Sequence, residues 1–167
     1  MQHSMQGSHS ILSQTKNNTT LWIGHLENDT NDHFAGQTFV CPESGLVNNI
    51  QVFSTSVHLP GDISLTLHEF DEQNKNWGPV ISTGSIHLEK GEEERWISFK
   101  LPAVQLEKNK TYGFRLQTPN AMIGLGEAAS PSKHPFTFGN EWNADSKNHN
   151  GHYYSYFSLA FKIEMCA

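Results

Sequence analysis

The chain has 167 residues, of which 36% are hydrophobic and 17% are charged, and its formal net charge is −6 at pH 7. This length fits one compact domain, and a composition with few charges but many small polar residues is typical of a loop-rich β protein. The Lys and Arg residues are scattered along the chain, which argues against binding to a nucleic-acid backbone. The sequence shows no signal peptide and no membrane-spanning stretch, so we expect no membrane insertion.

The first segment differs from the rest of the chain. Residues 1–18 are polar and show no sustained period, which predicts a flexible arm or a strand supplied to a neighbouring molecule. Residues 19–167 are predicted to form a single domain.

Short segments that alternate apolar and polar residues fill most of that domain. In the segment 61–70, Ile63, Leu65 and Leu67 point to one side while the residues between them point to the other, as a half-buried strand requires. The same pattern places Arg115 on the outward side of a strand whose inward residues are aromatic or apolar. Strands are predicted over 20–26, 37–41, 46–55, 62–70, 80–88, 95–102, 110–118, 121–127 and 152–165.

Roughly nine or ten short strands separated by Gly, Pro, Asn and Asp, without a convincing helix, predict an all-β fold. The expected architecture is an antiparallel two-sheet β-sandwich that resembles a jelly roll.

Two long polar segments, 71–79 and 129–151, interrupt the alternation, and each holds one tryptophan. An exposed indole offers an apolar surface to the C–H face of a sugar ring, so Trp77 and Trp142 are candidate ligand-binding residues. The alternative is that both tryptophans fold back and cap an open end of the sandwich.

Polar and aromatic residues next to Trp142 extend this candidate site. Asn143, His152, Tyr153 and Tyr154 carry groups that hydrogen-bond to hydroxyls or present a ring. We therefore predict that they contribute to the same site. The alternative is that the tyrosines are ordinary residues of an edge strand.

A run of acidic residues suggests a structural calcium ion. Glu27, Asp29 and Asp32 are closely spaced, and Glu164 near the end of the chain is a further carboxylate. Calcium prefers six to eight oxygen ligands of this kind. Acidic runs are also common in plain turns, and no cofactor is required by the sequence.

Two cysteines, Cys41 and Cys166, are too few to indicate a disulfide framework. A buried free Cys41 and an exposed free Cys166 are preferred over a disulfide. Motifs such as GxSxG or HExxH do not occur in the sequence, and we predict that the protein is not an enzyme.

Four stretches, 36–70, 77–86, 95–117 and 157–164, together resemble bacterial jelly-roll modules of the choice-of-anchor type. They contain an opening GQTF, a Pro-Gly turn, a WGP segment, a Pro-x-x-x-Leu turn before KTYGF, and a closing LAFK. These modules are similar in shape to carbohydrate-binding modules and galactose-binding-like domains. The resemblance implies a non-catalytic sandwich that is extracellular or associated with a cell surface.

The sequence therefore predicts a binding or adhesion module, whose ligand is a glycan or another cell-surface ligand contacted by the aromatic residues named above. The alternative is a structural subunit of a surface, fibre or tail-like assembly. In that case residues 1–18 dock on a neighbouring molecule and the protein forms a homo-oligomer.

Overall fold

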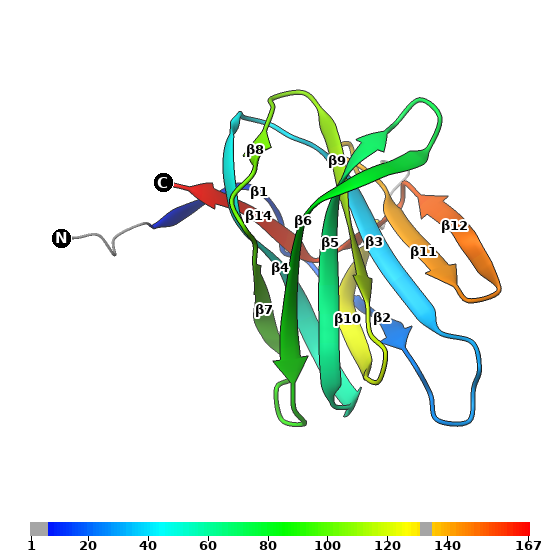
Figure 1. Cartoon of the computed structure of the whole chain (residues 1–167). Coiled ribbons are helices and arrows are strands. Elements are labelled where there is room, and N and C mark those ends of the chain that lie inside the picture. The colour runs from blue at the N-terminus through cyan, green and yellow to red at the C-terminus, as the bar shows by residue number, and fades with distance from the viewer. Residues whose placement is uncertain (1–6, 131–134) are drawn as a thin grey trace.

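A computed structural model describes residues 7–130 and 135–167, which form 14 strands and no helix (Figure 1). The strands are β1 (Ser8–Gln14), β2 (Thr19–Gly24), β3 (His33–Val40), β4 (Gly45–Leu59), β5 (Gly61–Asp71), β6 (Asn76–Leu88), β7 (Arg95–Lys100), β8 (Gln105–Leu106), β9 (Thr111–Gln117), β10 (Met122–Ala129), β11 (Glu141–Asp145), β12 (Asn148–Tyr154), β13 (Phe157–Leu159) and β14 (Phe161–Cys166).

All strand pairs in this part of the chain are antiparallel. One group of strands follows the order β12-β11-β3-β9-β5-β6. In the other group, the long strand β4 pairs with β7 along one edge. Along its other edge, β4 pairs first with β14 and then with β10. β1 pairs with β14, and β2 pairs with β10. A single residue pair, Gly24 with His33, links β2 to β3 and so connects the two groups.

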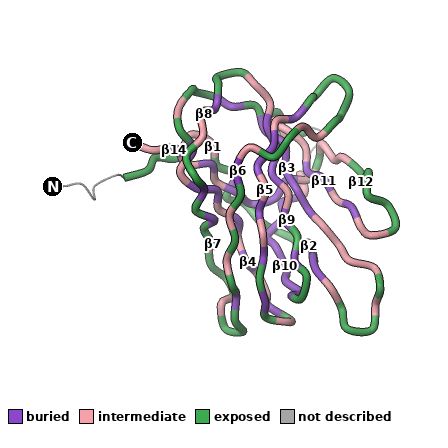
Figure 2. Tube along the Cα trace, in the orientation of Figure 1, coloured by how far each residue is buried: buried purple, intermediate pink, exposed green. Residues whose placement is uncertain are grey.

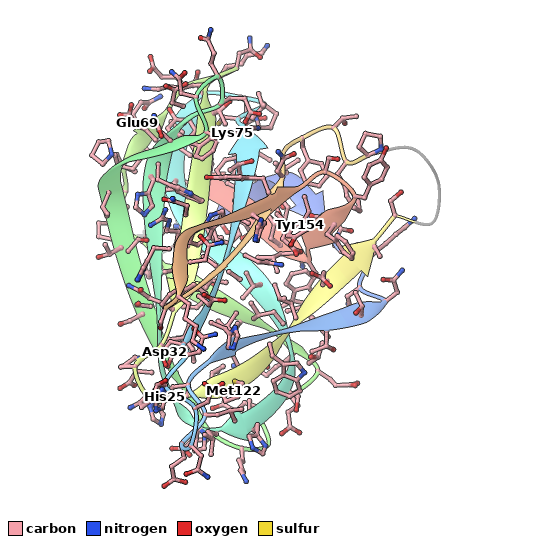
Figure 3. The ribbon with its side chains drawn as sticks, turned by 90° about the vertical axis from the view of Figure 1, so that its right-hand side faces the viewer. His25, Asp32, Glu69, Lys75, Met122 and Tyr154 are labelled. Carbon is pink, nitrogen blue, oxygen red and sulfur yellow. The ribbon has the colours of Figure 1, made fainter. Side chains whose placement is uncertain are left out.

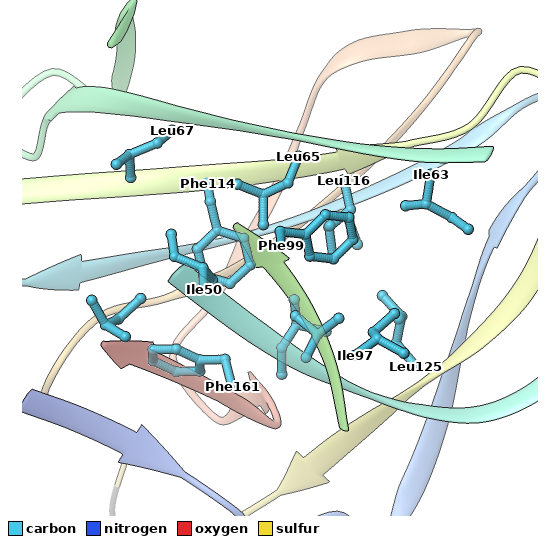
Figure 4. Packing of buried hydrophobic residues seen from close by; sticks show 14 of the residues in the cluster. Ile50, Ile63, Leu65, Leu67, Ile97, Phe99, Phe114, Leu116, Leu125 and Phe161 are labelled. Atoms are coloured by element: carbon cyan, nitrogen blue, oxygen red, sulfur yellow. The ribbon is translucent and has the colours of Figure 1, made fainter. Parts of the chain in front are cut away.

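Apolar side chains from both groups meet in one core. Ile63, Leu65 and Leu67 of β5 are at most 1% exposed, and Figure 4 shows them on one side of a packed layer that includes Ile97 and Phe161 from the other group. Buried residues run along the middle of the strands and exposed residues gather in the connections (Figure 2). The predicted all-β antiparallel fold is confirmed, and it is consistent with a β-sandwich.

Residues 8–14, which we expected to belong to a flexible arm, form β1 and pair with β14 of the same chain. Ile11 and Leu12 pack against the core. The register shifts between Ser10 and Leu12, and such a β-bulge removes the regular alternation by which a strand is recognised. Residues 1–6 of the predicted arm lie outside the described residues.

The two segments predicted as loops also contain strands. β6 begins at Asn76, so Trp77 belongs to a strand. Within 129–151, the hairpin of β11 and β12 adds two strands beside β3, and residues 131–134 of this segment lie outside the description. This hairpin was not predicted because its side chains are largely polar, so apolar residues do not alternate along it. The sequence of β12, for example, is NHNGHYY.

Both cysteines are free, with Cys41 buried and Cys166 half-buried. Burial raises the pKa of the Cys41 thiol. Over residues 7–130 and 135–167, no helix is long and apolar enough to cross a membrane.

Candidate functional site

A cluster of aromatic residues around Arg115 covers the outward surface of β9, β3 and β5. On β9, Tyr112, Phe114 and Leu116 are buried in the core. Side chains alternate between the two sides of a strand, so Gly113 and Arg115 face outward. Gly36 on β3 lies directly opposite Arg115 in the ladder.

Two tryptophans pack against the Arg115 guanidinium. Its central carbon lies 4.3 Å from the ring centroid of Trp77 and 4.4 Å from that of Trp142. The two indoles contact each other edge to face, with centroids 5.3 Å apart. Each contact is short enough for a favourable cation–π interaction, and the rings shield the guanidinium from water. This burial lowers the pKa of Arg115 from its usual value, but an arginine remains charged in a protein.

Glycines in the underlying strands make room for the rings. A Cβ atom at Gly113 would lie 2.6 Å from Cζ3 of Trp77, and one at Gly36 would lie 3.1 Å from Cε3 of Trp142. The first distance is shorter than real Cβ contacts allow. The indoles therefore lie directly on the backbone of β9 and β3. The Trp77 ring explains glycine at position 113, whereas at position 36 the carbonyl oxygen of Phe114, 2.6 Å away, is a closer obstacle than the Trp142 ring.

Three further rings fix the position of Trp77. His68 and Phe70 contact it edge-on, with centroids 5.3 Å and 5.1 Å from the indole, and Tyr153 of β12 packs against Phe70 at 5.8 Å. Both His68 ring nitrogens have partners, the Thr66 hydroxyl at 2.8 Å and the Gly78 carbonyl at 3.0 Å. Burial, and to a smaller extent the nearby Arg115 charge, lower the pKa of His68.

A cavity of about 500 Å³ opens beside this cluster. It is lined by the following residues from β6, β9, β12 and the β5–β6 turn: Lys75, Asn76, Trp77, Arg115, His149, Asn150, Gly151 and Tyr153. A second cavity of about 180 Å³ shares Arg115 and His149 and also reaches Phe34 and Trp142. The two cavities therefore meet at Arg115 on β9.

The predicted ligand-binding residues divide between two faces of the β11–β12 hairpin. Trp77, Trp142 and Tyr153 gather around the cavities. Trp142 is only 2% exposed, and its Nε1 donates a hydrogen bond to the Asn150 carbonyl. Trp142 thus supports Arg115 from beneath, while Trp77 and Tyr153 line the larger cavity.

The other three predicted residues face away from these cavities. Asn143 and His152 are direct partners in the β11–β12 ladder, next to the Trp142–Tyr153 pair, so they lie on the opposite face. They line a separate cavity of about 230 Å³. Tyr154 packs edge-on against Phe157, with ring centroids 5.7 Å apart.

The structure separates the residues predicted to hold calcium. Asp32 is hydrogen-bonded to His25 in the β2–β3 connection, near one end of the molecule in Figure 3. Glu164 lies on β14 and accepts a hydrogen bond from Ser8 at 2.7 Å. In the described part of the chain, no group of three or more His, Cys, Asp and Glu side chains is arranged to hold a metal ion.

Sequence reasoning did not select Arg115 or Lys75 as site residues, although both line the larger cavity. The available signal was Arg115 itself, which is an outward cation on a strand between two buried apolar residues, Phe114 and Leu116. Lys75 gave no comparable signal, because turns contain such residues routinely.

A pair of buried carboxyls lies on the core side of β11. Glu141 is fully buried and Glu127 is 7% exposed. Burial, together with the adjacent Glu127 carboxyl, raises the pKa of Glu141 far above its ordinary value. Two carboxyls so close together are stable when they share a proton, so Glu141 is neutral at pH 7.

No model of a known protein family matches the chain, and a comparison with curated proteins yields no similar sequence.

Proposed function

We propose that this protein is a non-catalytic carbohydrate-binding module that binds its ligand in the 500 Å³ cavity beside Trp77. The single observation that carries the proposal is the combination of aromatic rings and amide groups along this cavity. Its volume lies within the range of about 300–1,000 Å³ that is typical of small-ligand sites. The extracellular or cell-surface setting that the sequence resemblance implies belongs to the same proposal.

The chemistry of the lining residues suits a saccharide. Trp77 and Tyr153 offer ring surfaces for the apolar C–H face of a pyranose. Asn76, Asn150 and His149 supply donors and acceptors for its hydroxyls. Because Trp77 is held by Phe70 and His68, its ring is already in place before a ligand arrives, which reduces the entropy lost on binding.

The lining residues offer little for catalysis. Among the described residues that line the cavity there is no Asp, Glu, Ser or Cys. Glycoside hydrolysis by the common mechanism needs two carboxyls, and acyl transfer needs an activated nucleophile. This composition favours binding over reaction.

The alternative function, a structural subunit of a larger assembly, was based on an arm that docks on a neighbour. Residues Ser8–Gln14 of that arm pair with β14 of their own chain. This pairing favours the binding module as the main proposal.

A glycan array tests the proposal with two matched variants. Trp77→Ala removes the ring at the cavity, whereas Trp96→Ala removes a half-buried tryptophan of β7 that packs on Phe53 in the other group of strands. We expect the unmodified chain to retain one class of glycan, Trp77→Ala to weaken that binding by about tenfold or more, and Trp96→Ala to leave it unchanged.

Circular dichroism must show that both variants are folded at the assay temperature. If the unmodified chain retains no glycan, or if folded Trp77→Ala and Tyr153→Ala variants both bind as well as the unmodified chain, the proposal is wrong.

A further inference from the structure

Arg115 has no anionic partner in the described part of the chain, although it is largely shielded from water. Its guanidinium contacts the two indole rings, and its Nε is buried without a hydrogen-bond acceptor. The other arginine, Arg95, is instead paired with Glu92 at 3.1 Å. Placing an unpaired charge in a poorly hydrated position is costly, and an anionic ligand would offset that cost.

The charges around the larger cavity have one sign. Lys75 and Arg115 line it, and Asp and Glu are missing from its described lining residues. This is unusual in a chain with a net charge of −6. Lys75 is paired with Glu72, whereas Arg115 has no carboxylate partner among the ion pairs of the described residues.

The two flanking indoles also restrict how a ligand can approach. Their ring centroids lie only 5.3 Å apart, so the two rings cover neighbouring sides of the guanidinium and a partner must approach from the side that borders the cavities. An N–H edge of arginine on that side can donate two parallel hydrogen bonds to a carboxylate. Arg115 also lies where the two cavities meet, so a group bound there can belong to a ligand that occupies either cavity.

We propose that the saccharide bound at this site is acidic, and that the carboxylate of a uronic acid residue pairs with the guanidinium edge of Arg115 while a neighbouring sugar ring packs on Trp77. This inference rests on the proposed carbohydrate-binding function and specifies the class of sugar.

Pairs of acidic and neutral ligands test the preference for an acidic sugar separately from carbohydrate binding in general. The probes are tetrasaccharides of galacturonic, mannuronic and glucuronic acid, each together with its carboxyl-reduced neutral counterpart. Isothermal titration calorimetry of the full chain with every pair measures how much the carboxylate contributes. We expect at least one acidic tetrasaccharide to bind about tenfold or more tightly than its reduced form, as is typical for a charged hydrogen bond.

Matched variants assign that preference to one residue. Arg115→Gln is expected to bind both forms with the same weak affinity, whereas Arg95→Gln keeps the preference of the unmodified chain. Arg115→Lys retains the charge without the two-pronged edge, so it is expected to recover only part of the preference. Thermal unfolding shows which variants are folded, and Arg115→Lys replaces Arg115→Gln if the latter does not fold.

The outcomes are distinguishable. If acidic and reduced tetrasaccharides bind equally well, or if folded Arg115 variants keep the full preference, the inference is overturned and the carbohydrate-binding function stands. If no tetrasaccharide binds and the glycan array is also negative, the function itself is wrong and the inference fails with it.

Discussion

The outer surfaces of the two strand groups both combine tryptophan with a cation, but only around Arg115 does the cation contact two indole rings in the described part of the chain. On β4, β7 and β14, the Lys162 ammonium lies 4.3 Å from the centroid of Trp96, which packs edge-on against Phe53 at 5.4 Å. On β9, the Arg115 guanidinium contacts two indoles and lines two cavities. A cation on one ring is an ordinary surface contact, whereas a cation that contacts two rings and borders a cavity is placed to meet a ligand.

The difference arises from the hairpins that flank each surface. The β11–β12 hairpin adds Trp142 and Tyr153 next to β3, and the β5–β6 hairpin brings Trp77 over Gly113. The surface around Trp96 lacks a comparable wall in the strands that the structure describes (Figure 1). The comparison teaches that the site depends on two hairpins and two glycines, and that the tryptophans alone are not sufficient.

The largest expected effect concerns the carboxyl that is buried beneath the β11–β12 hairpin. Glu141 keeps its proton in the folded state, mainly because of burial, while in the unfolded chain it loses the proton above a pKa near 4.5. Above that pH the unfolded state binds fewer protons, so stability is present at low pH and falls as pH rises, by about 1.4 kcal/mol per pH unit. We expect Glu141→Gln to abolish this decline and to raise the free energy of unfolding at pH 8.

Denaturant titrations between pH 5 and pH 9 measure this effect. Glu164→Gln serves as the control, because Glu164 on β14 is hydrogen-bonded to Ser8 and Asn49 and lies away from Glu141. The control is expected to keep the decline of stability with pH. The account of Glu141 is contradicted if Glu141→Gln follows the same pH profile as the unmodified chain.

A smaller effect is expected from filling the space under Trp77. Gly113→Ala places a methyl group 2.6 Å from the present position of the indole, so the ring must move. Such overpacking is expected to destabilise the fold by about 1–2 kcal/mol and to weaken glycan binding. The same substitution in a Trp77→Ala background is expected to cost little, because the obstructing ring is gone. Equal costs in both backgrounds would show that the glycine is needed for another reason.

The cation–ring contact of the second surface is expected to contribute less. Lys162→Met keeps an apolar chain over Trp96 but removes the charge, and we expect a loss of about 0.5–1 kcal/mol in the free energy of unfolding. Glycan binding is expected to stay unchanged, as measured on the array. If Lys162→Met abolished binding, the ligand site would belong to the surface around Trp96.

The smallest effects concern two histidines on the β5–β6 ladder. His68, beneath Trp77, has a lowered pKa because it is buried, so its contribution to stability is present above pH 6.5 and is lost as pH falls below that value. His87 has a raised pKa because Asp62 and Glu89 accept hydrogen bonds from it, so its contribution is present below pH 6.5 and fades as pH rises. NMR titration of the imidazole protons should give a lower pKa for His68 than for His87. The reverse order would show that Trp77 does not shield the His68 imidazole from water.

Alternation of apolar and polar residues predicted the strands that bury one face. It placed the inward residues of β5 and β9 correctly and assigned Arg115 to the outward side, as the burial of Tyr112, Phe114 and Leu116 confirms. It did not predict β1, whose bulge interrupts the pattern. It also did not predict the β11–β12 hairpin, which consists largely of polar residues and is held by backbone pairing with β3.

The candidate site was only partly predictable for the same reason. Trp77, Trp142 and Tyr153 attracted attention by residue type, and the structure brings them together. The register of β11 and β12 then decides which neighbours share their face, and it turns Asn143, His152 and Tyr154 to the other side. The register of the two strands cannot be predicted from the sequence when the hairpin itself is not recognised.

The most direct test of the central claim uses the four tryptophans as reporters. In a proton–nitrogen NMR spectrum, each indole N–H gives its own signal, and an acidic tetrasaccharide is added stepwise. The account predicts that the signals of Trp77 and Trp142 shift together and saturate, while those of Trp22 and Trp96 stay in place. A saturating shift at Trp96 or Trp22 with Trp77 unmoved would contradict it.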